Sequence, residues 1–492
     1  MTAAARPSGR VDAWAAAGAV AAGLAIAARS NALTFIALPA PLASAAAIAS
    51  ALRDQPRVAW SAGDLALAGV GCARELRGSG PDRWIEIVRA ARGLDVAGAV
   101  INGEAAPVAA LGSLAAHGAA RPRLFGGAAF APGAADRTPW LGFGDAWFML
   151  PRWTYVREGC AAHLVLAVDA RDAVDAARWH DELAALHAAL ASYAARPQPA
   201  VVELQRASAA EWRDQVVAIT DAIANGSCSK IVAARTCSLA LAGAARPADL
   251  LAALDVRHAD CVRVLIQPAN AGALVAATPE RLVRRDGDLV WCDALAGTRS
   301  IATGDDLGAT REQLVADASA ALRASTKDRR EHALVVQAIR AALTAWADVD
   351  APVEPEIRTL RHVVHLHTPF RARLHAPRHV LELAARLHPT PAVGGTPHEV
   401  AVEWIRHHEP VARGWYASPI GWFDLDGNGE LAVAIRSGVL AGNRAHLWAG
   451  AGIVAGSDPD RELAETELKL RAMLGALGVD GEPQPASGVE AG

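Results

Sequence analysis

The hydrophobic positions are most regular in the second half of the chain. Ser208 and Glu211 form a capping box, which marks the start of a helix. Apolar side chains then follow at the spacing of one helix face, at Trp212, Val216, Ile219 and Ile223. Asn225 and Gly226 would end that helix, and the apolar run 230–235 that follows is typical of a buried strand. The pattern therefore predicts a helix followed directly by a strand.

The alternation of strands and helices continues towards the C-terminus. Residues 274–278 form another predicted strand, and Asp286-Gly287 is a hairpin turn between two more. A long helix is predicted over 326–346, and a last helix begins near Asp458, a preferred N-cap residue. Because strands and helices occur in irregular order, the pattern favours an α+β fold over a parallel doubly wound sheet.

The first half of the chain carries weaker signals. Short strands broken by glycine and proline are predicted within 60–71 and 124–153, and an alanine-rich helix over 175–193. The stretch 196–199, which reads Arg-Pro-Gln-Pro, is the best candidate boundary. It separates a half with few candidate chemical residues from a half that is dense in them.

The N-terminal residues raise the question of a targeting signal. An apolar stretch, 14–28, follows Arg6 and Arg10, as in a signal peptide. The stretch is mostly alanine, which is weakly apolar, and it is too short for a membrane-spanning helix. We therefore expect a cytoplasmic protein with a mobile segment at 1–40 and a disordered tail at 477–492.

Composition narrows the class of protein further. Of the 492 residues, 52% are hydrophobic and 20% are charged, which excludes a mainly disordered chain. A formal net charge of −4 gives no electrostatic reason to expect nucleic acid or an anionic membrane as a partner. Six cysteines lie far apart without zinc-type spacing, so reduced thiols are expected rather than a disulfide framework.

Lysine is unusually rare in this chain. Only three of the 48 basic residues are lysines, namely Lys230, Lys327 and Lys469. A lysine ammonium is a compact donor that can lose its proton when buried, whereas an arginine guanidinium stays charged. The lysines can therefore mark positions whose chemistry arginine cannot supply, although chance retention explains any single one equally well.

The last predicted helix presents two carboxylates and a lysine on one face. Glu462 and Glu465 are three positions apart, and Lys469 follows four positions later. A solvated face with an ordinary Glu–Lys pair is the alternative interpretation. The glycine-rich stretch 450–456 just before the helix supports a binding role, because its backbone N–H groups can approach an anion closely.

A second carboxylate pair, Asp328 and Glu331, lies on the helix predicted over 326–346. Two helices that each present two carboxylates suit a hard divalent ion, and Mg²⁺ takes a few carboxylates together with water and an anionic ligand. Taken alone, this second pair would be interpreted as a surface charge cluster.

Two other motifs begin like metal sites without completing them. Residues 424–429 match the start of a calcium loop, but Ile435 stands at the twelfth position, where a glutamate is required, so a hairpin turn is expected. His365 and His367 lie two apart on a predicted strand and could bind zinc. No third ligand has suitable spacing, so we interpret them as structural histidines.

Taken in order, the second-half segments resemble the chorismate-utilising enzymes, and among these the isochorismate synthases. The matching runs are SKIVAAR at 229–235, TPERL at 278–282, AGTR at 296–299, STKDRREH at 325–332, HLHTP at 365–369, LHPTPAVGG at 387–395, AIR at 434–436 and the block 449–474. They cover about residues 205–475 in the family's order, and the combination is specific although no single run is. The fold that the resemblance implies is one large α+β domain, 41–476, in which two antiparallel sheets pack together with helices outside.

The resemblance also implies a catalytic pair. Lys230 matches the general base that activates a water, and Glu280 matches the acid that protonates the departing 4-hydroxyl of chorismate. Moving a hydroxyl from C4 to C2 requires a base on one side of the ring and an acid on the other. Glu280 must therefore stay protonated, with its pKa raised by its environment.

The metal and substrate contacts follow from the same resemblance. Mg²⁺ would be held by Glu331 and Glu465, with Asp328 and Glu462 orienting its water molecules. The groups expected to bind chorismate or to line its ring are Thr298, His365, Arg436, Gly450, Gly452 and Lys469. Because chorismate is a dianion, a metal ion, an arginine and a lysine suit its carboxylates.

The choice of product separates the close alternatives. Relatives that make anthranilate or aminodeoxychorismate need no lysine to activate water, so Lys230 argues against both products. Salicylate synthase shares the lysine and then eliminates pyruvate from isochorismate. The run 389–395 resembles dedicated isochorismate synthases and favours release of isochorismate.

A non-catalytic homologue would lack a catalytic residue, and none of those expected is missing. The resemblance implies a monomer, and the pathway served (siderophore, salicylate or menaquinone) stays open.

Overall fold

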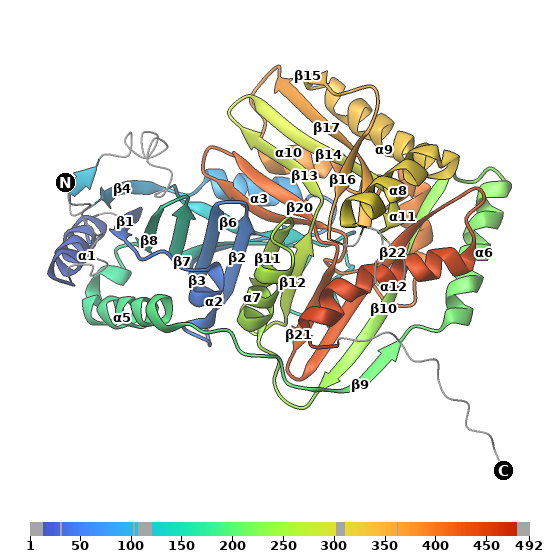
Figure 1. The fold of residues 1–492 in the computed structure, drawn as a ribbon. Coiled ribbons are helices and arrows are strands. Elements are labelled where there is room, and N and C mark those ends of the chain that lie inside the picture. Colours follow the sequence, from blue (N-terminus) through green and yellow to red (C-terminus); the bar gives the residue numbers. More distant parts are fainter. Residues whose placement is uncertain are drawn as a thin grey trace, which may run out of the picture.

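The computed structural model describes residues 13–29, 32–101, 104–106, 121–301, 310–361 and 363–479. The strands in these ranges belong to one hydrogen-bonded network, and their pairings are antiparallel except for that of β1 with β4. Two long strands, β3 (Leu65–Gly78) and β7 (Ala146–Glu158), pair along most of their length near the middle of this network. The network divides at β7 into two branches, which Figure 1 shows as two groups of strands.

The first branch contains the strand on which the candidate catalytic residue Lys230 lies. β7 pairs through residues 153–158 with β8, and β3 pairs through residues 65–70 with β2. In spatial order the branch is β5 (Glu104–Ala106), β4 (Val96–Ile101), β1 (Leu33–Pro39), β8 (Ala161–Val168), β7, β3, β2 (Arg57–Ala62), β11 (Val262–Gln267), β12 (Ala273–Thr278), β21 (Ser437–Ala441), β22 (Arg444–Val454), β10 (Lys230–Leu241) and β9 (Val201–Arg206).

The second branch starts at the other half of β7, where residues 146–149 pair with β6. In spatial order it is β6 (Arg123–Ala128), β19 (Pro419–Asp424), β20 (Gly429–Val433), β13 (Arg281–Asp286), β14 (Leu289–Ser300) and β17 (Val363–Leu374), with β15 (Ala347–Asp350) and β16 (Glu356–Thr359) on β17. The short β18 (Gly395–Thr396) pairs with the start of β10. The chain therefore crosses repeatedly between the branches.

Helices cover the outer faces of both branches. Those that pack on the first branch are α1 (Ala13–Ala27), α2 (Ala45–Ser50), α5 (Ala176–Ser192), α7 (Pro247–Arg257), α6 (Ala209–Ala224), α11 (His398–His408) and α12 (Pro459–Ala476). Those that pack mainly on the second branch, or on β3 and β7 where the two branches meet, are α3 (Arg83–Arg92), α8 (Arg311–Ala324), α9 (Thr326–Thr344) and α10 (Val380–Leu387). A 3₁₀ turn covers Asp172–Val174. None of the described helices is long and apolar enough to cross a membrane.

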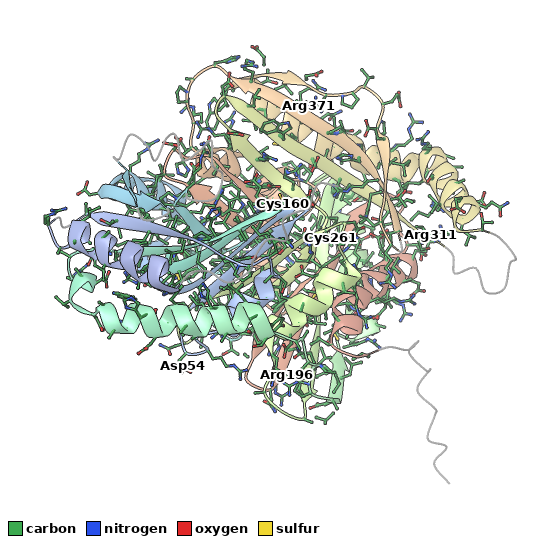
Figure 2. All side chains as sticks on the ribbon, turned by 60° about the vertical axis from the view of Figure 1, so that its left-hand side comes forward. Asp54, Cys160, Arg196, Cys261, Arg311 and Arg371 are labelled. Carbon is green, nitrogen blue, oxygen red and sulfur yellow. The ribbon has the colours of Figure 1, made fainter. Side chains whose placement is uncertain are left out.

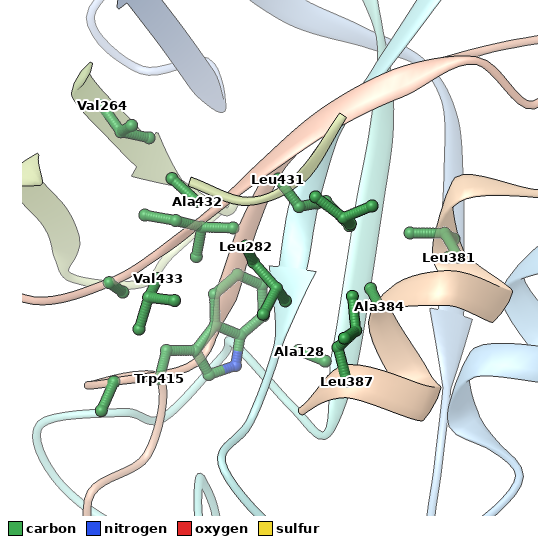
Figure 3. Close-up of a cluster of buried hydrophobic side chains, with 14 of the residues drawn as sticks. Ala128, Val264, Leu282, Leu381, Ala384, Leu387, Trp415, Leu431, Ala432 and Val433 are labelled. Atoms are coloured by element: carbon green, nitrogen blue, oxygen red, sulfur yellow. The ribbon is translucent and has the colours of Figure 1, made fainter. Parts of the chain in front are cut away.

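The main hydrophobic core lies between the branches. Along β2, Val58 and Trp60 belong to this core, whereas Ala59 belongs to a second core under the helices, as the period of two in a strand requires. Figure 3 shows Leu282 of the second branch gathered with Val264 of the first and with the ring of Trp415. Burial of such apolar surface is the dominant favourable contribution to folding, and here it holds the two branches together.

Local signals in the sequence are reflected in the structure. The Ser208 hydroxyl accepts from the backbone N–H groups of Ala210 and Glu211 at the start of α6, and the Asp458 carboxylate caps α12 by accepting from Arg461 N. Charged side chains such as Asp54, Arg196, Arg311 and Arg371, which are labelled in Figure 2, are exposed. All six cysteines are free, in agreement with the expectation of reduced thiols.

The predicted α+β class is correct, and two details of the organisation differ from the expectation. The two sheets are joined into one network, because β3 and β7 are long enough to contribute to both branches. Within the predicted mobile segment 1–40, residues 13–27 and 33–39 form α1 and β1, and β1 is buried between β4 and β8. The predicted boundary at residue 41 therefore falls after the first regular structure. Residues 1–12 and 480–492 lie outside the described ranges.

Candidate active site

One cavity collects most of the predicted site residues. Its walls come from β14 and β17 of the second branch, from β22 of the first, and from α9 and α12. The predicted residues that line it are Glu280, Thr298, Glu331, His365, Arg436, Gly450, Gly452, Glu465 and Lys469. Segments separated by almost 190 positions in the sequence therefore meet at one place, as the resemblance implied.

Lys230 lies directly behind the wall of this cavity. Its side chain is fully buried at the first residue of β10, and its Nζ is 2.8 Å from Glu331 Oε1. A Cβ atom on Gly452 would lie 2.4 Å from Glu331 Oε1 and 2.8 Å from Lys230 Cε. Only glycine at position 452 leaves space for this pair, which adds a steric role to the amide role predicted from the sequence.

Glu280 lies in the segment between β12 and β13 and is 4% exposed. Burial raises the pKa of Glu280 to about 8, and the charge of Asp293 adds to this, while Lys230 and Lys469 oppose it. Among the residues that the structure describes, none donates a hydrogen bond to its carboxyl group. Near neutral pH the carboxyl group is therefore mostly protonated, and it can donate a proton into the cavity.

The two predicted metal carboxylates come from different helices. Glu331 belongs to α9 and Glu465 to α12, and both line the cavity. Burial by itself would raise the pKa of Glu331, but the charge and hydrogen bond of Lys230, together with the charges of Lys327 and Lys469, outweigh it and leave the pKa lowered. Glu465 forms an ion pair of 2.7 Å with Lys469, whose Nζ also donates to Gly450 O at 2.8 Å. Glu331 is thus held ionised.

The two further carboxylates lie in an adjoining, more open cavity. Asp328 and Glu462 line it together with Lys327, and Glu465 lines both cavities. Burial raises the pKa of Glu462, and the charge of Glu465 adds to the effect. Burial likewise raises the pKa of Asp328. Lys327 forms an ion pair with Glu462. Each of the three lysines in the chain is therefore paired with one of the predicted carboxylates.

This donor set fits a hard cation in its chemistry, although no close ligand triad is formed. Four carboxylates from two helices meet where the two cavities join, and Mg²⁺ prefers oxygen donors of this kind. No three of the four place their oxygen atoms within 4.8 Å of one another. In the described ranges that spacing occurs at His258, Asp260 and Cys261, where Arg436 Nη1 lies 3.9 Å from Cys261 Sγ and disfavours a cation.

Arg436, His365 and Thr298 form a connected group on another wall. Arg436 Nη2 lies 3.2 Å from His365 Nε2, and the other ring nitrogen, Nδ1, lies 3.1 Å from Thr298 Oγ1. Burial, followed by the charge of Arg436, places the pKa of His365 well below its usual value. His365 is therefore a neutral imidazole near neutral pH.

Sequence reasoning did not predict Arg413 and Tyr416, which also line the cavity. Arg413 Nη2 donates to Val232 O at 2.8 Å, its Nη1 donates to Val393 O, and it forms an ion pair with Glu409. These contacts use its donors to hold the wall rather than a ligand. The i,i+4 spacing of Glu409 and Arg413 was the available signal, but it is common on surfaces.

The two incomplete metal motifs have structural roles. Asp424 Oδ1 accepts from the backbone N–H groups of Asp426 and Asn428, so the calcium-like segment is a turn between β19 and β20, as predicted. His367 Nε2 lies 2.9 Å from Asp293 Oδ1. His365 instead faces the cavity, so only one of the two histidines is purely structural.

Comparisons with known proteins identify the family of the chain. A profile of the family described as chorismate binding enzyme matches residues 26–478. The chain therefore belongs to the chorismate-binding enzyme family.

Within this family, the chain is similar to several isochorismate synthases. The chain is 39% identical over 437 residues to the salicylate biosynthesis isochorismate synthase of Pseudomonas aeruginosa, which covers 87% of this chain and 86% of the relative. It is 34% identical over 368 residues to the isochorismate synthase MenF of Bacillus subtilis, covering 74% of this chain and 76% of the relative. The solved structure of MenF, the menaquinone-specific isochorismate synthase from Escherichia coli, superimposes with a TM-score of 0.75 at 25% identity, covering 94% of this chain and 100% of that one.

Proposed function

We propose that this protein is an isochorismate synthase, an isomerase that converts chorismate to isochorismate with Mg²⁺. The observation that carries the proposal is a buried carboxyl group, Glu280, whose pKa is raised by burial, in the same cavity whose wall holds the Lys230–Glu331 pair. An acid and an amine at one ring-sized cavity are the two groups that this hydroxyl exchange requires. The relatives named above support the same activity.

The chain's own residues supply the proton transfers. Lys230, in its neutral amine form, accepts a proton from a water whose oxygen forms a bond to C2 of the ring. Two ring double bonds shift, the C4–O bond breaks, and Glu280 donates its proton so that the 4-hydroxyl leaves as water. One water enters and one leaves, so the reaction is an isomerisation. Arg436 and Lys469 hold the two substrate carboxylates during these steps.

A divalent ion bound by Glu331 and Glu465 would neutralise a substrate carboxylate and stabilise negative charge that develops in the transition state. Both carboxylates are paired with lysines, Glu331 with Lys230 and Glu465 with Lys469. When the carboxylates serve as metal ligands, both amines become available, Lys230 to the attacking water and Lys469 to the substrate. Metal binding and the release of the two amines are thus linked in this proposal.

The alternative product is salicylate, formed by pyruvate elimination after isochorismate. The run 389–395 favours release of isochorismate, and it contacts β10, the strand that begins at Lys230. Val232 N donates to Gly394 O at 2.8 Å, and β18 pairs with Lys230 and Ile231. The run therefore contributes to the position of the base.

We further propose that the enzyme is a cytoplasmic monomer, and that its product is used for salicylate or a siderophore derived from it, or for menaquinone.

The test is product analysis with purified enzyme, chorismate and Mg²⁺. Isochorismate should accumulate in an amount equal to the chorismate consumed in the approach to equilibrium, without salicylate or pyruvate. Equal amounts of salicylate and pyruvate would instead assign a salicylate synthase. Absence of chorismate turnover would refute the proposed activity altogether.

A further inference from the structure

Arg436 is held by uncharged partners. Its Nη2 lies 3.2 Å from His365 Nε2, and its Nη1 donates to Cys261 Sγ at 3.9 Å. No ion pair joins Arg436 to a carboxylate anywhere in the described ranges. This contrasts with the three lysines of the site, each of which has a carboxylate partner.

The hydrogen bonds of His365 define its tautomer. Gly297 O, which can only accept, lies 3.3 Å from His365 Nδ1, so the ring proton belongs on Nδ1. Nε2 then carries a lone pair, which is the group that an arginine N–H requires as an acceptor. A protonated imidazole would turn an N–H towards Arg436 instead. His365 can hold Arg436 in this geometry only in its neutral form.

Cys261 is the second uncharged acceptor, and it has no role assigned by the proposed mechanism. It lies in the turn between α7 and β11 and is labelled in Figure 2. It is 3% exposed. Burial raises the pKa of its thiol to about 11, so the sulfur stays neutral. Cys261 does not line the main cavity. The contact that links Cys261 to this cavity is the one with Arg436.

The backbone fixes the origin of the arginine side chain. Arg436 has a φ of +48°, in the left-handed region that non-glycine residues rarely adopt. Its carbonyl accepts from Ala277 N at 3.1 Å, and the strand β21, which begins at Ser437, pairs with β12. Strained backbone of this kind persists where the surrounding structure determines it, and it is frequent at ligand sites.

Two other charged groups act on Arg436 from neighbouring segments. Asp260 is exposed in the same turn as Cys261, and Arg358 belongs to β16. Because Asp260 is in water, solvent screens its charge, and neither residue forms an ion pair with Arg436. The guanidinium therefore keeps a positive charge that no buried carboxylate neutralises.

We propose that His365 and Cys261 are positioning residues, which orient Arg436 through uncharged acceptors and so leave its full charge available to a carboxylate of the substrate. This inference rests on the proposed function, in which Arg436 binds that carboxylate. An anionic partner would orient the arginine equally well, but the substrate would have to displace it or share the charge.

The test compares two substitutions of nearly equal size at a residue outside the cavity. Cys261→Asp places a carboxylate against Arg436, and Cys261→Asn places a neutral amide there. We expect the KM for chorismate to be at least about tenfold higher in the Asp variant than in the Asn variant, with kcat values within about threefold. Mn²⁺ affinity should be the same in both. Equal KM values in the two variants would overturn the proposal.

A second pair covers the case in which Cys261→Asp does not fold. His365→Gln retains an oxygen acceptor for Arg436, whereas His365→Glu introduces a charge in the same volume. The Glu variant should bind chorismate at least about tenfold more weakly than the Gln variant, and equal dissociation constants would contradict the inference. Measuring these constants by calorimetry in a Lys230→Ala background removes turnover. A failure of the positioning role is then distinct from a failure of the proposed activity, which the product analysis reports.

Discussion

Lys230 and Lys469 each pair with a carboxylate that lines the cavity, whereas Arg436 in the same cavity has only neutral acceptors as partners. Paired charges can exchange partners when a divalent ion arrives, because a metal ion can replace an ammonium as the counter-ion of a carboxylate. An arginine held by neutral groups can bind an anion without losing an ion pair first. The difference indicates that the paired carboxylates are suited to exchanging an ammonium for a metal ion, and that Arg436 is suited to binding an anion.

The largest effect on this comparison is expected from removing the proposed base, Lys230, which is paired with Glu331. Lys230→Ala should lower kcat by about a hundredfold to ten-thousandfold, the range for loss of a general base. Lys230→Arg keeps the positive charge beside Glu331 but cannot easily lose a proton, so it should be equally inactive. Steady-state assays of both variants, with thermal unfolding as a check on folding, provide the measurement. Substantial activity of the Arg variant would show that Lys230 acts only as a counter-ion.

Glu280, the proposed proton donor, should have the next largest effect on the rate. Because the pKa of Glu280 is raised to about 8 by burial, the proton donor is present below that pH and is lost above it. In wild-type enzyme kcat/KM, which reports the groups of the free enzyme, should fall as the pH rises through about 8. Glu280→Gln cannot donate this proton, so its rate should be about a hundredfold lower and should lack that decrease. A decrease of the same size in the Gln variant would assign the titration to another group.

Replacing a proposed metal ligand should have a smaller effect, which is measured as the affinity of the free enzyme for Mn²⁺. Glu331→Gln should weaken Mn²⁺ binding to the free enzyme by about tenfold to a hundredfold, as observed when groups of a metal site are replaced. Glu403→Gln is the matched control, because Glu403 is exposed on α11 and pairs with Arg406. Calorimetry would measure both affinities. Equal affinities in the two variants would place the metal elsewhere.

Much of the second half of the chain was predictable from local signals. Helix starts at Ser208 and Asp458, and the turn at Asp286-Gly287, depend on residues a few positions apart, which a sequence displays directly. The meeting of residues such as Glu280 and Lys469 in one cavity came only from the family resemblance, because their spacing in the chain carries no information about distance in space.

Other features could not be predicted for a physical reason. The joining of both branches at β7 depends on how long strands bend and share partners, which hydrophobic alternation does not encode. Strand β1 is buried through pairing with residues more than 60 and 120 positions away, so an alanine-rich N-terminus looked mobile. The contact between Cys261 and Arg436 joins residues 175 positions apart, and no motif marks it.

The most direct test of the central claim follows the oxygen of the attacking water. The reaction should be run in water enriched in ¹⁸O, and the isochorismate formed should be examined by mass spectrometry and by ¹³C NMR. Activation of water by Lys230 predicts one ¹⁸O atom in each product molecule, bound at C2. Product without ¹⁸O at C2 would mean that the 4-hydroxyl is transferred within the substrate, and would contradict the roles assigned to Lys230 and Glu280.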